Sequence, residues 1–415
     1  MRQGRLRSVA VSESKIILRV AAKGDGVSAD GSHFAGTAPG DMVAPDGIIT
    51  RGPHFAAAPC QHFGTCGGCQ LQHVDEETLR DFVTARVTNA TLKEGLEVGQ
   101  LLPTHLSPPR SRRRASLHIQ NAGGRPLVGF RKAGSHQVVD MQQCEILRPE
   151  LFALIAPLRQ MMARRQGKYS VDAELTLTDQ GVDCSLKNLT IEGLQQTEAM
   201  LDFARDNGLA RLTLDQGYGP ETVWEPQPVT MIFGGVAVGF PSGGFLQATA
   251  DGEAALVKDA REWLSGSKLI ADLFSGLGTF AFALAGTDGD KGAKVLAAEA
   301  ARDMHFSCKS AAGFAKRSVH SMHRDLFRNP LQLDELNRFN AVLLDPPRAG
   351  AKDQIALLAD STVAKVVYIS CNPSSWARDA ARMVAGGYRL EKLRAVGQFR
   401  WSTHVEMASL FVKQP

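Results

Sequence analysis

The chain has 415 residues, of which 44% are hydrophobic and 22% charged, and its formal net charge is only +4. At about 150 residues per domain, this length predicts two or three domains with ample core. No stretch approaches the roughly 18 uninterrupted apolar residues of a membrane span, and no apolar signal-peptide core follows the basic N-terminus. We therefore expect a cytoplasmic protein without a membrane partner, in which the seven cysteines are reduced, catalytic or metal-bound rather than paired in disulfides.

Residues 1–58 contain short β-type runs, such as 15–20, separated by turns rich in glycine. This pattern predicts a small all-β barrel. A cysteine-rich loop follows at 59–74. From 75 to 248 strand-type alternation, as in 171–177, mixes with helical spacing, as in 151–165, which predicts a central α+β domain.

Three cysteines, Cys60, Cys66 and Cys69, fall within ten residues of this loop, with two glycines between the last pair. Three thiols in one loop and a distant fourth are typical of an iron–sulfur cluster or of tetrahedral zinc. Cys144 is the best candidate for the fourth ligand. Zinc sites more often contain two Cys-x-x-Cys pairs, and the single pair here favours iron–sulfur.

Basic residues dominate the start of the central segment. Between Glu97 and Asp140 there is no acidic residue, whereas the following basic residues occur there: Arg110, Arg112, Arg113, Arg114, Arg125, Arg131 and Lys132. Such a block is typical of contact with a phosphate backbone, and the alternative is a solvated basic face. The run 110–114 is the candidate clamp for a phosphate backbone.

From 249 to 415 apolar strand-type runs alternate with helical stretches; the runs are 269–274, 294–298, 341–344 and 365–369. This alternation predicts parallel βαβ units and a doubly wound, Rossmann-like sheet. Ligands of such sheets bind at the carboxyl ends of the strands.

The first of these runs leads into a turn containing Gly276 and Gly278, and Glu299 ends the next run. Glycines allow a ligand to approach the backbone, and an acid at the end of the second strand can accept hydrogen bonds from ribose hydroxyls. The third glycine of a dinucleotide motif is missing, so an adenosine without phosphates, such as S-adenosylmethionine, fits better. The alternative is an ordinary turn between strand and helix.

Two later runs are followed by residues that are candidates for ligand binding or catalysis. Asp345 is followed by two prolines that fix an extended loop, where the carboxylate can bind a substrate donor or the cofactor's amine. Cys371 follows 365–369 directly and precedes Asn-Pro, which places a candidate nucleophile at the ligand-binding edge. The alternative for Cys371 is a small buried core residue.

Taken together, these motifs resemble those of the RNA 5-methyluridine methyltransferases, in particular the iron–sulfur branch that acts on 23S ribosomal RNA. The similar segments are Cys-x5-Cys-x2-Cys at 60–69, Phe245-Leu-Gln247, Ser370-Cys371-Asn372-Pro373 and His404-Val405-Glu406. The resemblance implies an N-terminal TRAM (OB-like) barrel at 1–58, a cluster loop at 59–74, a central RNA-contacting domain at 75–248 and a methyltransferase domain at 249–415.

The resemblance also implies roles for single residues. Cys371 would add to uracil C6 and Glu406 would remove the C5 proton. The implied contacts to S-adenosylmethionine are Gln247, Phe274, Thr279, Glu299, Asp325 and Asp345. The implied ligands of a [4Fe-4S] cluster are Cys60, Cys66, Cys69 and Cys144. RNA is the implied partner, ribosomal RNA first, and no obligate protein partner is expected.

Two departures from the family pattern bear on the site. Thr249 stands where the family usually has Asn, and Gly397-Gln-Phe-Arg400 replaces its usual Asp-Met-Phe-Pro. The loop before Glu406 is therefore expected to differ in shape.

Two alternative functions remain open at this stage. An amino-methyltransferase acting on adenine N6 or glutamine also uses Asp-Pro-Pro, but it has an aromatic residue next, where Arg348 stands here. A non-catalytic iron–sulfur RNA-binding protein would leave Cys371 and Glu406 as core residues. The first alternative predicts a methyl group on an exocyclic nitrogen rather than on uracil C5. The second predicts no covalent adduct with 5-fluorouridine RNA.

Overall fold

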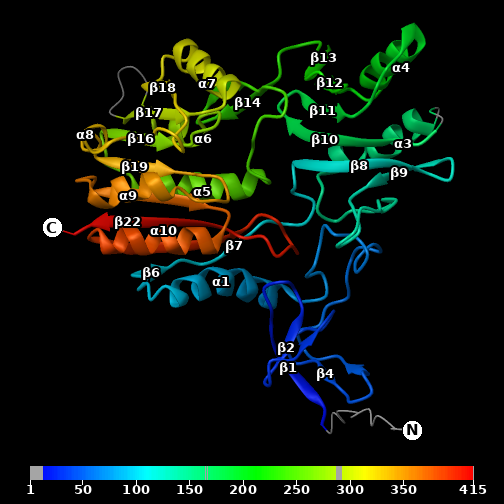
Figure 1. Cartoon of the computed structure of the whole chain (residues 1–415), viewed down its shortest axis with the longest axis horizontal. Helices are drawn as coiled ribbons and strands as arrows, with labels where there is room; N and C mark the ends of the chain where they lie inside the picture. The colour runs from blue at the N-terminus through cyan, green and yellow to red at the C-terminus, as the bar shows by residue number, and fades with distance from the viewer. Residues whose placement is uncertain (1–12, 164, 166, 287–291, 415) are drawn as a thin grey trace, which may run out of the picture.

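The computed structural model of the chain describes residues 13–163, 165, 167–286 and 292–414. Three large sheets and one two-stranded sheet are described, with the N-terminal sheet at one end of the molecule (Figure 1). The first twelve residues of the predicted barrel lie outside the described part of the chain.

The N-terminal sheet has the order β3-β2-β1-β4-β5. Its strands are β1 (Lys15–Val20), β2 (Gly26–Ser28), β3 (His33–Phe34), β4 (Met42–Val43) and β5 (Ile49–Thr50). The buried carboxylate of Asp41 holds its turns together, because it accepts hydrogen bonds from Ala38 N at 3.0 Å and Gly52 N at 2.7 Å. The two edge strands do not pair within the described residues, so the sheet is consistent with the predicted barrel but is open.

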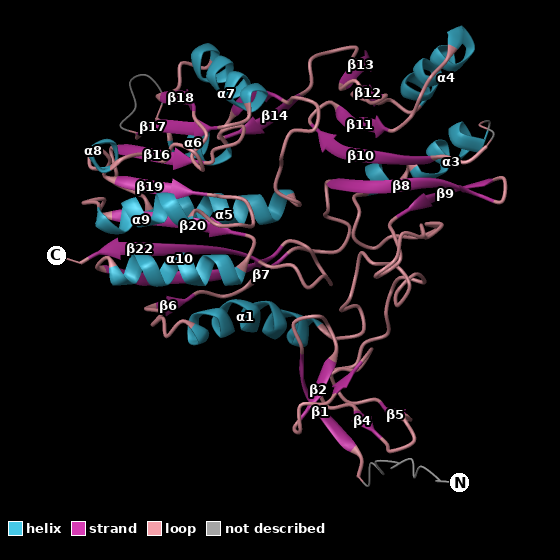
Figure 2. Cartoon of the chain, in the orientation of Figure 1, coloured by secondary structure: helices cyan, strands magenta, loops and turns pink. Residues whose placement is uncertain are grey.

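The central sheet has the order β13-β12-β11-β10-β8-β9 and is covered by helices on one side (Figure 2). Its strands are β8 (Arg114–Ala122), β9 (Arg125–Gly129), β10 (Ser170–Thr178), β11 (Gly181–Lys187), β12 (Arg211–Asp215) and β13 (Pro220–Trp224), and the helices are α2 (Pro149–Phe152), α3 (Ile155–Ala163) and α4 (Gly193–Asp206). Alternate residues of β10 are buried, which is the period-2 pattern of a half-buried strand. The predicted strand 171–177 is present within β10, whereas the predicted helix 151–165 is divided into the two helices α2 and α3.

The C-terminal sheet is the Rossmann-like one that the alternating pattern predicted. Its order is β18-β17-β16-β19-β20-β22-β21-β6, with β7 also on β21. The strands are β16 (Leu269–Leu273), β17 (Lys294–Glu299), β18 (Val319–His323), β19 (Ala341–Leu344), β20 (Lys365–Ser370), β21 (Tyr388–Gly397) and β22 (Glu406–Lys413). The helices are α5 (Ala250–Trp263), α6 (Thr279–Leu284), α7 (Arg302–Phe314), α8 (Leu333–Leu336), α9 (Lys352–Asp360) and α10 (Pro373–Ala385), and a hairpin of β14 (Thr230–Phe233) and β15 (Val236–Gly239) packs beside α7.

The central strands of this sheet are apolar because both faces are covered. All residues of β19 are fully buried, as are residues 366–369 of β20. Strands β16 to β20 pair in parallel, whereas β22 runs antiparallel between β20 and β21. This antiparallel return brings the C-terminal segment back across the sheet.

Part of the segment predicted as central also belongs to the C-terminal sheet. The short strands β6 (Gln100–Leu101) and β7 (His105–Leu106) pair in parallel with β21, and α1 (Glu76–Lys93) packs against β21 and α10. The chain therefore contributes to this sheet before it builds the central one. No described helix is long and apolar enough to cross a membrane.

Candidate active site

The pairing register brings the predicted site residues to one edge of the C-terminal sheet. Leu273 pairs with Ala298 and with Leu344, so the next residues, Phe274, Glu299 and Asp345, leave neighbouring strands side by side. Ser370 pairs with Met407 across the antiparallel β20–β22 ladder. The residue after Ser370 is Cys371 and the residue before Met407 is Glu406, so these two side chains also meet at this edge.

This edge opens into one cavity of about 1080 Å³. Ligand cavities are usually about 300–1,000 Å³, so this one has room for a cofactor and a nucleobase together. All eight residues predicted for cofactor binding and catalysis line it: Gln247, Phe274, Thr279, Glu299, Asp325, Asp345, Cys371 and Glu406.

One end of the cavity is shaped for a flat ring beside a sugar. Phe274 has a φ of 62°, and its ring lies 5.3 Å from that of Phe327, centroid to centroid, in a tilted arrangement. Glu299 accepts hydrogen bonds from Gly276 N at 2.9 Å and Ala301 N at 2.6 Å, which fixes its carboxylate at the strand end. Two oxygens with free lone pairs remain for hydroxyl donors.

Asp325 lies at the same end and accepts a hydrogen bond from Phe327 N at 3.0 Å. Asp345 lies deeper, and its Oδ2 accepts a hydrogen bond from Gln247 Nε2 at 3.1 Å. Gln247 is buried and its Oε1 accepts a hydrogen bond from Gln398 Nε2 at 2.8 Å. Two amides thus support one carboxylate of the cavity wall.

Three carboxyl groups are crowded under the cavity. Burial and the other carboxylates raise the pKa of Asp272 well above its usual value, and neither of its oxygens has a hydrogen-bond partner within the described chain. Burial raises the pKa of Asp345 to about 7. Burial, with Asp345 next, raises the pKa of Glu406 to about 8. This is an environment in which a bound cation is favoured and a neutral carboxylic acid persists near pH 7.

Cys371 is half-buried at the centre of this edge. Burial, followed by the carboxylates of Glu406 and Asp345, raises the pKa of its thiol to about 11, whereas the guanidinium of Arg348 lowers it. Arg348 Nη2 also donates a hydrogen bond to His404 Nδ1 at 2.7 Å, which holds this imidazole neutral. The thiolate therefore depends on the neutralisation of its carboxylate neighbours.

The arginines of the run 110–114 lie in different surroundings, and its role as an RNA clamp stays a prediction. Arg112 and Arg114 line the cavity, with Arg114 4.3 Å above the ring of Phe245. For Arg113 the prediction is corrected. This side chain is buried and forms an ion pair with Glu253 of α5 at 2.6 Å, so it holds the start of the central sheet against α5. It is therefore unavailable for phosphates.

The other basic residues of the segment 97–140 also divide into those that pair with carboxylates and those that line the cavity. Arg110 pairs with Glu145 and Arg125 with Asp140. Arg131 and Lys132 line the mouth of the cavity. The side chains at this mouth thus combine cations with exposed aromatic rings, an arrangement suited to single-stranded nucleic acid.

The four predicted cluster cysteines line a second, smaller cavity: Cys60, Cys66, Cys69 and Cys144. Burial raises the pKa of Cys66 and Cys144, and that of Cys69 to about 12. Within the described chain, no three of these sulfurs lie within 4.8 Å of one another. A single tetrahedral zinc ion, with Zn–S near 2.3 Å, would need sulfurs about 3.8 Å apart.

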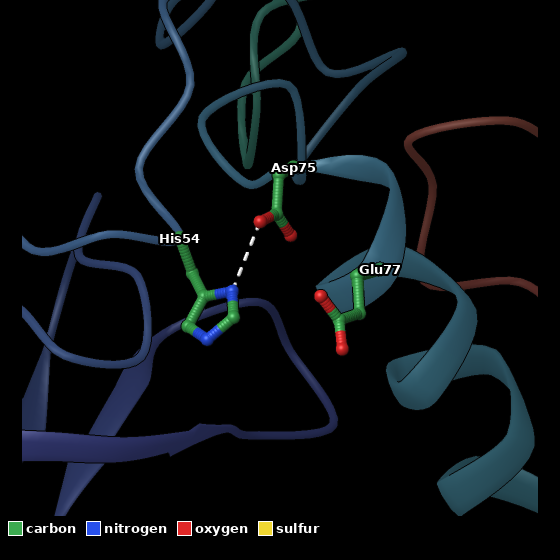
Figure 3. A group of neighbouring side chains, drawn as sticks. All are labelled: His54, Asp75 and Glu77. Carbon is green, nitrogen blue, oxygen red and sulfur yellow. Dashed lines mark hydrogen bonds and ion pairs between the residues drawn. The ribbon is translucent and has the colours of Figure 1, made fainter.

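One other group of side chains lies close enough to share an ion, with ligand atoms of His54, Asp75 and Glu77 within 4.8 Å of one another (Figure 3). Asp75 is already satisfied. Its Oδ1 caps α1 by accepting from Thr78 N at 2.8 Å, and its Oδ2 lies 2.9 Å from His54 Nδ1. We assign this group to the anchoring of α1.

The sequence did not single out three features of the main cavity: Phe327, Gln398 and the Arg348–His404 pair. Phe327 follows Asp325 in an irregular loop, where no periodic pattern exists. A signal did exist for Gln398, because it stands in the run that departs from the family pattern.

Comparison with known proteins is consistent with this site. The family model described as tRNA (Uracil-5-)-methyltransferase matches residues 238–414. An uncharacterized RNA methyltransferase of Zymomonas mobilis is 46% identical over 400 residues, 96% of this chain and 100% of the relative. The 23S rRNA (uracil(1939)-C(5))-methyltransferase RlmD of Chromohalobacter salexigens is 31% identical over 88% of this chain and 78% of its own.

A solved structure shares the fold. The Pyrococcus abyssi tRNA (uracil-54, C5)-methyltransferase in complex with S-adenosyl-L-homocysteine has a TM-score of 0.73 and 21% identity, over 96% of this chain and 99% of that one. The fold is thus that of an α/β S-adenosylmethionine-dependent methyltransferase. The chain belongs to the RNA uracil-5-methyltransferase family. Membership of this family decides against the amino-methyltransferase alternative. The chain is an enzyme, which decides against the non-catalytic alternative.

Proposed function

We propose that this protein methylates C5 of a uridine in large-subunit ribosomal RNA, with S-adenosylmethionine as methyl donor and Cys371 as covalent nucleophile. The observation that carries the proposal is the meeting of Cys371, Glu406 and Asp345 in one cavity that also holds the Phe274–Phe327 pair and Glu299. A nucleophile, a base and an adenosine-shaped recess are the parts that such a reaction requires.

The recess would hold the cofactor with its adenine against Phe274 and Phe327 and its ribose hydroxyls on Glu299. Gln247, Thr279, Asp325 and Asp345 complete the proposed contacts. The crowded carboxyl groups fit a cationic ligand, because a positive charge relieves their mutual repulsion. When bound, the cofactor supplies an electrophilic methyl group that is taken by uracil C5.

Cys371 makes C5 reactive. Uracil C5 is a poor nucleophile, and addition of the Cys371 sulfur at C6 turns it into an enolate-like carbon. The thiol needs help to ionise, because burial and the carboxylates raise its pKa to about 11. Arg348, which lowers this pKa, is the cationic neighbour that we expect to stabilise the thiolate.

Glu406 would complete the reaction. After methyl transfer the C5–H proton passes to the Glu406 carboxylate, the S–C6 bond breaks and the C5–C6 double bond re-forms, which frees Cys371. A base whose pKa is raised toward neutrality, here to about 8, is well matched to such a step.

The target base must leave its stack to reach Cys371, as in other enzymes that modify nucleobases. We propose that Arg112, Arg114, Arg131 and Lys132 contact the RNA backbone at the mouth of the cavity. Ribosomal RNA is proposed as the substrate because the relative RlmD is named for 23S rRNA.

We further propose a [4Fe-4S] cluster on Cys60, Cys66, Cys69 and Cys144. The donor set fits, since four thiols face one cavity and their sulfurs are too far apart for a single zinc ion. Gly68 N also donates to Cys66 Sγ at 3.4 Å, an interaction that stabilises thiolate ligands of clusters. The cluster has no part in the proposed methyl transfer.

The decisive experiment incubates the purified protein with S-adenosylmethionine labelled in its methyl group and with total RNA from a strain lacking the protein. We expect label in 5-methyluridine of large-subunit RNA, at one mapped position. Label in transfer RNA instead would change the substrate, and label on an exocyclic nitrogen would contradict the proposed chemistry.

A second experiment tests the covalent step. RNA containing 5-fluorouridine cannot lose its C5 substituent as a proton, so it should remain bonded to the wild-type protein. An absence of this adduct in the presence of active enzyme would contradict the role of Cys371.

A further inference from the structure

His404 lies in the main cavity but has no part in the reaction proposed above. It stands two residues before Glu406, and both side chains line the cavity. Val405, between them, is buried in the core instead. The imidazole therefore lies on the same side of the chain as the proposed base, which must face C5 of the uracil.

The loop 398–405, which carries His404 from β21 to β22, is fixed by the rest of the fold. Trp401 O accepts hydrogen bonds from Gln70 N at 2.7 Å and from Leu71 N at 2.9 Å. The indole of Trp401 is itself buried. The imidazole is thus held on an anchored loop, as a group that must meet a ligand at a set position requires.

Hydrogen bonds also connect His404 to the segment that carries the proposed nucleophile. Asn372, the residue after Cys371, donates from Nδ2 to Arg348 O at 2.9 Å, and Ser375 Oγ donates to the same oxygen at 2.9 Å. Arg348 Nη2 then donates to His404 Nδ1 at 2.7 Å. Arg348 is therefore fixed next to Cys371 through its backbone, and it fixes His404 through its side chain.

The bond to Arg348 decides which nitrogen of His404 carries the proton. A guanidinium only donates hydrogen bonds, so Nδ1 is the acceptor and the neutral ring carries its proton on Nε2. Partial burial lowers the pKa of His404, and the guanidinium groups of Arg348, Arg112 and Arg86 lower it further, so the ring is neutral near pH 7. Among the described residues none accepts a hydrogen bond from Nε2. A donor is thus left for a ligand of the cavity.

The proposed reaction creates an acceptor for this donor. When the Cys371 sulfur bonds to C6, the C5=C6 electron pair moves between C5 and C4, and the C4=O pair moves to O4, which becomes an enolate oxygen. Attack of C5 on the methyl group returns this pair and re-forms C4=O. The charge on O4 exists only between these steps, so a donor aimed at O4 lowers the barrier more than it tightens the binding of the uridine.

We infer that His404 donates a hydrogen bond from Nε2 to uracil O4 and stabilises the enolate that forms when Cys371 adds to C6. The inference rests on the proposed function. O4 is the acceptor because it is attached to the neighbour of C5, the atom that Glu406 faces. Arg348 strengthens the donor, since its charge polarises the imidazole through the bond to Nδ1. The proton stays on Nε2, so the ring is unchanged when C4=O re-forms.

The first test is His404→Leu, which keeps a side chain of similar bulk and removes both ring nitrogens. We expect kcat for methyl transfer to fall about 10²–10³-fold, the usual cost of one donor to a developing oxyanion, while the affinity for RNA changes little. His404→Gln keeps an acceptor for Arg348 and a donor for O4, so it should restore most of the rate. A loss of affinity at unchanged kcat would overturn the inference.

A matched control is His320→Leu. His320 is an exposed histidine on β18, an edge strand of the same sheet, and it does not line the cavity. Its replacement should leave kcat at the wild-type value. An equal fall in kcat in both variants would overturn the assignment to His404.

A change in the substrate tests the assignment to O4. In RNA with 4-thiouridine at the mapped position, sulfur replaces O4 and is a weak acceptor. The penalty of His404→Leu should shrink to about tenfold on this RNA, since little hydrogen bonding remains to be lost. A purely structural role of His404 would give the same penalty on both RNAs, and that result would overturn the inference.

A readout without activity separates this inference from the proposed function. In NMR spectra of the free protein with isotope-labelled histidine, the His404 ring should be neutral at pH 7 with its proton on Nε2, and Arg348→Met should raise the pKa of His404. A ring that is protonated at pH 7, or that carries its proton on Nδ1, would overturn the inference alone. A wild-type protein that leaves uridine C5 unmethylated would overturn the inference together with the proposed function.

Discussion

Burial raises the pKa of two kinds of thiol in this protein: the single thiol of Cys371 and the thiols of the group that contains Cys69. The surroundings of the two differ. Cys371 lies at a sheet edge beside carboxyl groups and Arg348, and its pKa is raised to about 11. Cys69 lies among three other thiols, and its pKa is raised to about 12. A raised thiol pKa alone therefore does not distinguish a proposed nucleophile from a proposed metal ligand, and the two proposals rest on the groups that surround each thiol.

The neighbours indicate how each thiolate can form. Four thiols facing one cavity ionise together only when a metal centre supplies positive charge. Cys371 has no such partner, and its thiolate requires that Glu406 and Asp345 be neutralised by protons or by a bound cation. The proposed cluster site would thus depend on metal, whereas the thiolate of Cys371 would depend on the charge state of the carboxyl groups.

Replacement of the proposed nucleophile should have the largest effect. We expect Cys371→Ala to lower methyl transfer by at least roughly 10⁴-fold, as loss of a covalent nucleophile does in other enzymes, and to abolish the adduct with 5-fluorouridine RNA. Cys184→Ala is the control: Cys184 is fully buried in β11, outside both thiol groups, so activity should remain and only stability should fall. Residual methylation in Cys371→Ala would refute the covalent role.

Replacement of the proposed base, Glu406, should have the second largest effect. Glu406→Gln should slow turnover by about 10²–10⁴-fold, the usual contribution of a general base. Because the thiol can still add to C6, the variant should accumulate protein bonded to RNA, which is visible on a denaturing gel. Loss of adduct in this variant would mean that Glu406 acts before the methyl transfer rather than after it.

The proposed cluster is tested by iron content. Purified without oxygen, the wild type should contain roughly four irons per chain, and alanine at any of Cys60, Cys66, Cys69 or Cys144 should remove most of them. Cys371→Ala and Cys184→Ala should keep the iron. One equivalent of zinc in place of iron would contradict the cluster.

The charge state of the carboxyl groups should appear in the stability of the cofactor-free protein. The pKa of Glu406 is raised to about 8 in the folded state, so the folded chain binds more protons than the unfolded chain above pH 4.5. Stability should then be highest at low pH and fall by a few kcal/mol as pH rises toward 8, at about 1.4 kcal/mol per pKa unit. Chemical unfolding at several pH values checks this, and Glu406→Gln should flatten the dependence.

The smallest effect is expected for Lys132, which lies between the main cavity and the cysteine-lined cavity. Lys132 lines the cavity mouth and forms a bridge with Cys66 through the backbone. Lys132→Ala should weaken RNA binding several-fold and reduce the slope of log affinity against log salt by about 1. Arg125→Ala is the control, since Arg125 already pairs with Asp140, and an equal change there would contradict the assigned RNA surface.

Local pattern was enough to predict the parallel sheet and its ligand edge. Apolar runs such as 341–344 allow only a strand covered on both faces, and the residues that follow such strands necessarily meet at one edge. The prediction for Arg113 failed because charge runs do not reveal which member turns inward. Its partner, Glu253, is 140 residues further along the chain, and no local rule connects the two.

The sequence by itself determined the chemical inventory: thiols in two groups, a glycine turn, acids at strand ends and a block of arginines. Each of these is a property of neighbouring residues. The tertiary structure decided which of them lie together, since the antiparallel return of β22 brings Glu406 to Cys371 and the loop after β21 brings Gln398 to Gln247. Such meetings depend on the pairing of strands distant in sequence, because only the packed sheet fixes the distances over which charges and hydrogen bonds interact.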